Sequence, residues 1–247
     1  MTKTCRCGKE YDAGTIALFL PVCPDCAKTW DAEMDAVIEA RYTTPNENGE
    51  KESDKLDALG IRPRHYGCTF DNFEPVNDSA VRALEVCKRM AETRRGIIAM
   101  IGNNGTGKTH LLCSTVRAIG AGHNYKMIEV GMFIREAFKP NSTKTEQEQL
   151  DALIKLPFLG IDEVEKSKRT ENEIVWLSYL IDERNERNRP TMIIGNCHPR
   201  TFHKDGQSCE KCFESIMTPD ILDRISQSGV IRYMDGESYR AKLRGKE

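Results

Sequence analysis

The stretch Gly102-Asn103-Asn104-Gly105-Thr106-Gly107-Lys108-Thr109 decides the fold class of this chain. Its two glycines five positions apart, followed by lysine and a hydroxyl residue, fit the pattern of a phosphate-binding loop. Residues 97–101 form an apolar run typical of a buried parallel strand, and residues 110–119 place apolar side chains on one helical face. Because the loop has this strand–loop–helix context, we predict an α/β protein that binds a nucleotide.

Each residue type in the loop has a chemical use. Glycines let the backbone turn tightly and bring N–H groups to phosphate oxygens, and the N-terminus of the next helix adds the positive end of its dipole. We expect Lys108 to contact the β- and γ-phosphates of ATP and Thr109 to hold Mg²⁺ through its hydroxyl. The predicted nucleotide-binding residues are Gly102, Asn103, Asn104, Gly105, Thr106, Gly107, Lys108, Thr109 and His110. The alternative is a glycine-rich turn that binds nothing.

Two acidic residues and an asparagine end two later apolar runs. Asp162 and Glu163 follow residues 158–161, and Asn196 follows residues 191–195. After a phosphate loop, this is the expected place for a carboxylate that steadies Mg²⁺, here Asp162, and for a base that polarises the attacking water, here Glu163. Asn196 is a candidate for orienting that water.

Strand-like and helix-like patterns alternate through the rest of the body. Strands are predicted at 125–130, 158–163, 191–196 and 229–233. Helices are predicted at 78–93, 132–138, 146–156, 171–187, the last with a charged tail, and 218–226. Such alternation indicates a parallel sheet flanked by helices.

Composition places the chain among globular proteins. Its 247 residues, 39% apolar and 30% charged, suit one domain of ordinary size with a smaller appendage. No apolar run approaches the roughly 20 residues that span a bilayer, and the N-terminus lacks a secretory apolar region. We therefore expect a cytoplasmic protein without a membrane partner.

Charge is unevenly distributed, although the net charge is only −2. Residues 1–60 carry 7 Lys and Arg against 12 Asp and Glu, whereas the remainder carries 29 against 26. This distribution fits a protein partner at the acidic end and confines any nucleic-acid contact to a local patch in the body.

Cysteines cluster near the N-terminus. Cys5-x-Cys7 and Cys23-x₂-Cys26 are separated by fifteen residues, and clustered thiols in a cytosolic chain usually indicate metal. Four thiolates can close a tetrahedral Zn²⁺ site, which a segment this short needs in place of a core. We predict a small zinc-ribbon-like module; unrelated thiols or a redox pair are the alternatives.

A second cysteine pair is more ambiguous. Cys209-x₂-Cys212 lies near Cys197, His198 and His203. The spacing is irregular and no second tight knuckle is evident, so a second zinc site here stays an open alternative.

We divide the chain at a polar segment. Residues 1–42 hold the cysteine module and an acidic amphipathic helix at 30–41, which packs on that module or presents its apolar stripe to another protein. Residues 43–55 have almost no apolar side chains and are predicted to be a flexible linker. Residues 56–247 form the nucleotide-binding domain.

Together these motifs resemble the DnaC-type replicative helicase loaders, which have the AAA+ P-loop NTPase fold. The resemblance covers roughly residues 56–247. Beyond the general ATPase motifs it rests on residues 61–73, on Asp223-Arg224-Ile225 and on the tail that contains Ser238-Tyr239-Arg240. It implies an ATPase with Asn196 as first sensor, Arg224 as the arginine finger that reaches a neighbour's γ-phosphate, and Arg240 as second sensor.

The resemblance also implies partners. Such loaders open the ring of a DnaB-type replicative helicase hexamer so that single-stranded DNA enters. Their N-terminal domain grips the helicase, and their ATPase domains stack as a spiral and contact DNA through a segment that corresponds to about residues 132–156. This chain departs from the family in its N-terminal cysteine module and in the enlarged loop around Cys209 and Cys212.

Three other functions share parts of this pattern. An IstB-like transposition helper has nearly the same ATPase core but acts on duplex DNA. A clamp-loader-like subunit also combines zinc with this fold, but the short tail leaves no room for its collar domain. An adaptor would bind ATP without hydrolysing it, and Glu163 and Arg224 argue against that.

Overall fold

The computed structural model describes residues 2–4, 9–12, 39–203, 207, 209–236 and 238. The four N-terminal cysteines, Arg240 and most of the amphipathic helix predicted at 30–41 therefore lie outside the described residues. At the N-terminus, β1 (Thr2–Thr4) pairs antiparallel with β2 (Glu10–Asp12). Among the described residues, no helix is long and apolar enough to cross a membrane.

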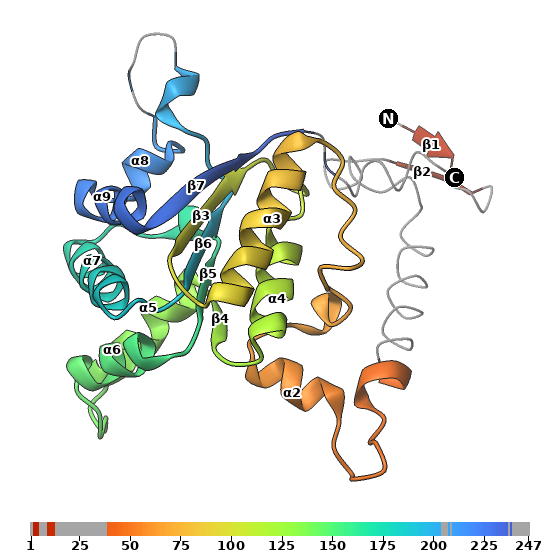
Figure 1. Ribbon diagram of the computed structural model, residues 1–247, viewed down its shortest axis with the longest axis horizontal. Helices are drawn as coiled ribbons and strands as arrows, with labels where there is room; N and C mark the ends of the chain where they lie inside the picture. Colours follow the sequence, from red (N-terminus) through yellow and green to blue (C-terminus); the bar gives the residue numbers. More distant parts are fainter. Residues whose placement is uncertain are drawn as a thin grey trace.

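A five-stranded sheet forms the centre of the molecule (Figure 1). Its order is β4 (His123–Lys126), β5 (Leu159–Asp162), β6 (Thr191–Gly195), β3 (Ile97–Gly102) and β7 (Gly229–Met234). Every neighbouring pair is parallel, and Ile97 lies opposite Thr191 on one side and Gly229 on the other. The predicted α/β fold with a parallel sheet flanked by helices is confirmed.

Side chains of β3 alternate between two cores. Ile97, Ala99 and Ile101 join one apolar cluster, and Ile98 and Met100 join the other. The first face is covered by α5 (Met127–Arg135), α6 (Glu146–Lys155), α7 (Glu171–Glu186), α8 (Phe213–Ile216) and α9 (Pro219–Ser228). The second is covered by α2 (Glu52–Ala58), α3 (Asp78–Thr93) and α4 (Lys108–Ile119). Strand β3 is thus apolar on both faces, as the sequence of residues 97–101 indicates.

Short helical turns connect these elements. They are η2 (Glu39–Thr43), η3 (Pro63–His65), η4 (Glu136–Phe138), η5 (Val164–Lys166) and η6 (Arg200–Phe202). Helix α2 begins at Glu52, inside the segment expected to be a linker. Tyr42, before that segment, is buried and its ring meets the ring of Tyr66 edge-on at 5.5 Å.

One prediction of local structure is wrong. The strand expected over residues 125–130 ends at Lys126, and helix α5 begins at Met127. Met127, Val130 and Ile134 are all buried, a spacing that suits a helix facing the core, and the Glu129 carboxylate accepts a hydrogen bond from the Lys126 backbone N–H at 2.8 Å. This hydrogen bond caps the N-terminus of α5. The strand therefore ends at Lys126, although the residues that follow have a composition typical of strands.

Candidate active site

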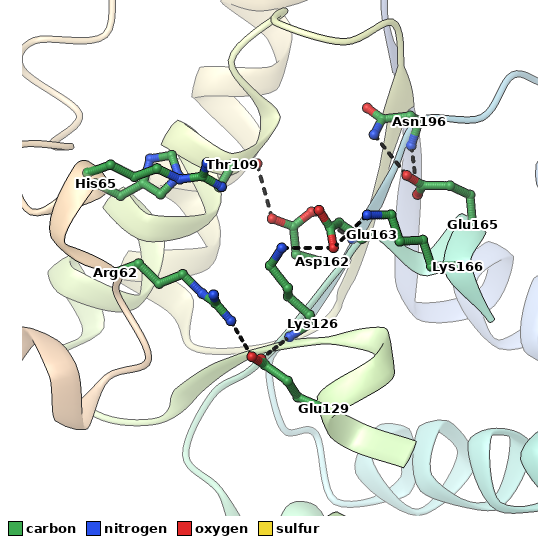
Figure 2. A network of polar contacts seen from close by, with 11 residues as sticks. Arg62, His65, Thr109, Lys126, Glu129, Asp162, Glu163, Glu165, Lys166 and Asn196 are labelled. Atoms are coloured by element: carbon green, nitrogen blue, oxygen red, sulfur yellow. Dashed lines mark hydrogen bonds and ion pairs between the residues drawn. The ribbon is translucent and has the colours of Figure 1, made fainter. Parts of the chain in front are cut away.

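The predicted site residues gather at one edge of the sheet. Parallel strands end at the same edge, so the ends of β3, β4, β5 and β6 bring together Gly102, Lys126, Asp162 and Asn196. Figure 2 shows Thr109, Asp162, Glu163 and Asn196 there with their partners. Ligands of open α/β sheets bind at this edge.

The phosphate loop connects β3 to α4 and is covered by two distant segments. Gly105 (φ 77°) and Gly107 (φ 97°) have left-handed backbone conformations that glycine tolerates. A Cβ at Gly105 would lie 2.0 Å from Ser238 Oγ, and a Cβ at Gly107 would lie 2.6 Å from Phe73 Cε2. Both glycines are therefore required by packing as well as by backbone conformation.

Lys108 is held inside the loop. Its side chain is 6% exposed, and Nζ donates hydrogen bonds to the carbonyls of Gly102 at 2.9 Å and Asn103 at 2.6 Å. The ammonium thus sits among neutral acceptors at the N-terminus of α4, where its charge and the helix dipole act together on an anion.

His110 joins the loop helix to the segment that enters the domain. Its Nε2 lies 2.8 Å from the carbonyl oxygen of Thr69, and its ring meets Phe73 edge-on at 5.3 Å. His110 therefore helps to hold Phe73 against the phosphate loop. The contact between His110 and the nucleotide stays a prediction.

Thr109 and Asp162 form the candidate Mg²⁺ position. The Thr109 hydroxyl donates to Asp162 Oδ2 at 3.1 Å, and the backbone N–H of Glu163 donates to Asp162 Oδ1 at 2.7 Å. Burial raises the pKa of Asp162, although these two hydrogen bonds oppose the shift. A hydroxyl and a partly buried carboxylate, both hard oxygen donors, fit a divalent cation that would restore the solvation lost by the carboxylate.

Glu163 is held by two lysines. Lys126 Nζ lies 3.0 Å and Lys166 Nζ 3.3 Å from Glu163 Oε2 (Figure 2). Burial raises the pKa of this carboxyl, but the hydrogen bonds and charges of the lysines outweigh it and lower the pKa. The carboxylate is therefore ionised at neutral pH, the form a general base needs. Its backbone φ of 59° is unusual for a residue with a side chain, and such strain is common at functional sites.

Asn196 contacts a different carboxylate. Its Nδ2 donates to Glu165 Oε1 at 2.8 Å, and its backbone N–H donates to Glu165 Oε2 at 3.0 Å (Figure 2). The structure therefore brings Asn196 to the same edge of the sheet as Asp162 but pairs it with Glu165. The sequence analysis missed this contact, because nothing in the spacing of two residues 31 positions apart indicates it.

A basic cavity lies beside the candidate Mg²⁺ position. Thr109 and Asp162 line it, together with Arg62, Arg64, His65 and Lys126. Arg62 is paired with Glu129 on α5. The sequence analysis missed Arg62, Arg64, His65 and Lys126 as site residues; for Lys126 the reason is that the strand was expected to continue to residue 130, which hid its place at a strand end.

The two predicted arginines lie apart from this set. Arg224 on α9 donates from Nε to Asp182 Oδ1 on α7 at 2.5 Å and from Nη1 to Gln227 Oε1 at 3.3 Å, so both partners belong to the helical layer. Arg240 lies outside the described residues. Ser238, two positions before it, touches the phosphate loop at Gly105.

Comparison with known proteins identifies the family. Residues 66–247 match the family described as IstB-like ATP binding protein. The chain belongs to this family. The matched region contains the phosphate loop, all five sheet strands, and Asp162, Glu163 and Asn196. As a member of the IstB-like ATP-binding family, an AAA+ ATPase family, the protein is an ATPase.

Individual relatives have narrower names. The chain is 25% identical to the replicative helicase loader DnaC of Escherichia coli K12 over 225 residues, covering 88% of this chain and 87% of the relative. It is 26% identical to DnaC of Buchnera aphidicola subsp. Acyrthosiphon pisum, covering 78% and 77%. Among solved structures, the DnaC helicase loader matches at 18% identity and a TM-score of 0.57 over 70% of this chain and 99% of that chain. DnaA of Aquifex aeolicus with bound AMPPCP matches at 18% and 0.56 over 71% and 53%. The structural matches establish the shared fold.

Replacement of Gly107 by Ala is expected to weaken ATP binding by about tenfold. The new methyl group combines a left-handed conformation, which costs about 1–2 kcal/mol, with a clash against Phe73. Titration with a fluorescent ATP analogue measures the change. Gly120→Ala is the matched control, because Gly120 ends α4 with φ 72° and no atom of the described residues lies within 4 Å of its Cβ position. Equal affinity of the two variants would contradict the packing argument.

Proposed function

We propose that this protein is an ATP-dependent loader that binds a replicative DNA helicase and helps to place it on single-stranded DNA. The observation that carries the proposal is the extent of the similarity to proteins named replicative helicase loaders, which covers 88% of the chain and so extends beyond the ATPase motifs. The carboxylates and lysines at the sheet edge supply the hydrolysis that such a cycle uses.

The proposed hydrolysis follows from the positions of the side chains. Lys108 exchanges its bonds to the loop carbonyls for bonds to the phosphates of ATP, and the loop holds the triphosphate at the N-terminus of α4. Thr109 and Asp162 would hold Mg²⁺, which would supply positive charge to the phosphate oxygens. Glu163 accepts the proton of the attacking water, and Lys126 keeps this carboxylate ionised. Asn196 orients the attacking water, or it holds the end of β6 in place through its hydrogen bond to Glu165.

We assign DNA contact to about residues 132–156, which run from α5 through η4 to α6. Met132 on α5 and Phe138 in η4 are exposed there, with 60% and 65% of their surfaces accessible. Lys144 lines the adjacent groove with polar residues. Exposed aromatic rings next to cations are typical of surfaces that stack the bases of single strands.

Arg224 supports assembly of several protomers in this proposal. Its side chain lies between α9 and α7, where it is open to a second molecule, and exchange of Asp182 for a neighbour's γ-phosphate completes the hydrolysis site across the interface. Repetition of this contact between successive protomers would build a spiral of protomers on the helicase. Residues 1–55, with a zinc ion bound by Cys5, Cys7, Cys23 and Cys26, are proposed to grip the helicase.

Replacement of Arg224 by Ala is expected to lower ATP turnover by about 10–100-fold, the equivalent of a charge-assisted hydrogen bond of about 1.5–3 kcal/mol. Affinity for ATP at low protein concentration should not change, because the residue serves another protomer. Arg187→Ala, which removes an exposed arginine paired with Glu183 on α7, is the control. A parallel loss of affinity in the Arg224 variant would place the residue in its own site instead.

The test of the function is ATP turnover by the full chain, alone and with single-stranded DNA, duplex DNA or a purified replicative helicase. The Lys108→Ala variant gives the background rate of ATP turnover. Stimulation by single strands together with a stable helicase complex supports the loader. Stimulation by duplex alone, without a helicase complex, contradicts it and favours the IstB-like transposition helper. Deletion of residues 1–55 should abolish the helicase complex and leave ATP binding intact.

A further inference from the structure

Four potential metal ligands converge in the connection between β6 and α8. They are His198, His203, Cys209 and Cys212, and one ligand atom from each lies within 4.8 Å of all the others. None of them belongs to the hydrolysis site. We propose that these four side chains bind one structural Zn²⁺ ion.

Two distances between the ligand atoms match a tetrahedral site. Cys209 Sγ and Cys212 Sγ are 3.8 Å apart, and Cys209 Sγ lies 3.4 Å from His198 Nε2. With Zn–S of about 2.3 Å and Zn–N of about 2.0–2.1 Å, tetrahedral geometry requires about 3.8 Å between two sulfurs and about 3.5 Å between sulfur and nitrogen. The sulfurs are also well beyond the roughly 2.05 Å of a disulfide bond.

His203 supplies an independent observation. Its ring centre lies 5.2 Å from that of His198, and its Nε2 is buried with no hydrogen-bond partner among the described residues. Leaving a buried polar atom unsatisfied costs about 1–3 kcal/mol. A metal ion among the four ligands would give this nitrogen the partner it lacks.

The backbone forms the tight turn that the sequence spacing did not reveal. The Lys211 backbone N–H donates to Cys209 Sγ at 3.4 Å, and the Cys212 backbone N–H donates to the Cys209 carbonyl at 3.0 Å. Amide hydrogen bonds to sulfur stabilise the thiolate that binds zinc. The Phe213 backbone N–H donates to the His198 carbonyl at 2.9 Å, so the turn is fixed against the segment that carries the first histidine.

His198 is oriented from outside the cluster. Its Nδ1 lies 3.2 Å from the Pro199 carbonyl oxygen, which leaves Nε2 for the metal. The ring of Phe202 stacks parallel to the imidazole at 6.0 Å and meets Tyr233 of β7 edge-on at 4.8 Å. The ligand ring is therefore held against the sheet.

The fifth candidate, Cys197, is not part of this site. It is 3% exposed and packs in the apolar core of the α5–α9 face. Two sulfurs and two nitrogens complete tetrahedral coordination and leave no position for a reactive water, so the ion is structural. The ion stabilises the connection that begins next to Asn196. Arg169, in the segment after Glu165, donates a hydrogen bond from Nη2 to the Glu210 carbonyl at 2.5 Å and so fixes the turn between the two cysteines.

Zinc content of the full chain, purified under reducing conditions and measured by elemental analysis, tests the proposal. To separate this site from the N-terminal cysteines, Cys5, Cys7, Cys23 and Cys26 are all replaced by Ser. This background is expected to retain about one zinc per chain, and addition of Cys212→Ser or His203→Ala to remove it. Cys68→Ser, a half-buried cysteine outside the cluster, should leave it in place.

A second measurement tests the site without the Cys212 and His203 substitutions, in case those variants fail to fold. Cobalt replaces zinc in the same background, and its visible spectrum should show sulfur-to-metal charge transfer of a site with two thiolates. Thiol labelling with mass spectrometry should find Cys209 and Cys212 protected until a chelator is added. A metal-free background protein with both thiols reactive would overturn the proposal, as would zinc retained by a folded Cys212→Ser variant.

Discussion

Replacing Glu163 by Gln is expected to lower ATP turnover by about 10²–10⁴-fold and to leave ATP affinity nearly unchanged. The amide keeps the size of the side chain and one oxygen for Lys126 and Lys166, but it cannot accept the proton of the attacking water. Thr109 and Asp162 stay in place, so the nucleotide and its metal still bind. Steady-state turnover with helicase and single-stranded DNA, beside a binding titration, separates the two quantities.

Glu165→Gln is the matched control for this experiment. Its carboxylate lies two positions away and accepts both hydrogen bonds from Asn196, so the substitution weakens a positioning contact without removing the proposed base. Its effect on turnover should be clearly smaller than that of Glu163→Gln. If the Glu165 variant were the more impaired of the two, the base would be Glu165 and the role given to Glu163 would be wrong.

Local patterns were sufficient to predict the centre of the fold. Residues 97–109 combine a strand that is apolar on both faces with glycines at the required spacing, and parallel strands must end at a common edge. Asp162 and Asn196 could therefore be placed at the phosphate loop without knowledge of the strand order.

Contacts that depend on the path of the chain could not be predicted. The partner of Asn196 and the covering of Gly105 by Ser238 join residues 31 and 133 positions apart. The candidate zinc cluster also depends on distant pairing, because the backbone bridge between His198 and Cys212 brings the two halves of an irregular motif together. Spacing along the sequence carries no information about such pairing.

Helix α7 shows the same limit in its charged tail. Residues near 184 look like a solvated helix end in the sequence, yet the guanidinium of Arg184 is completely buried. It donates to the carbonyls of Leu153, Ile154 and Leu156 at 2.8–3.0 Å, which closes the C-terminus of α6. It also donates to the Pro190 carbonyl at 2.7 Å. Burial lowers its pKa, and its described acceptors are neutral oxygens.

Replacing Arg184 by Met is therefore expected to lower the free energy of unfolding by about 3–5 kcal/mol. Several buried carbonyls lose their donor at once, and each unsatisfied carbonyl costs about 1–3 kcal/mol. Removal of a desolvated charge offsets part of this cost. Urea unfolding followed by circular dichroism measures the change. Arg187→Met, three positions on, removes an exposed arginine from an i,i+4 pair with Glu183 and should change the stability far less, because solvent screens an exposed ion pair. Equal stabilities would mean that water or a backbone shift satisfies the α6 carbonyls. A large difference, with ATP affinity retained by the folded Arg184 variant, would show that this arginine joins α6, α7 and β6 without taking part in the chemistry.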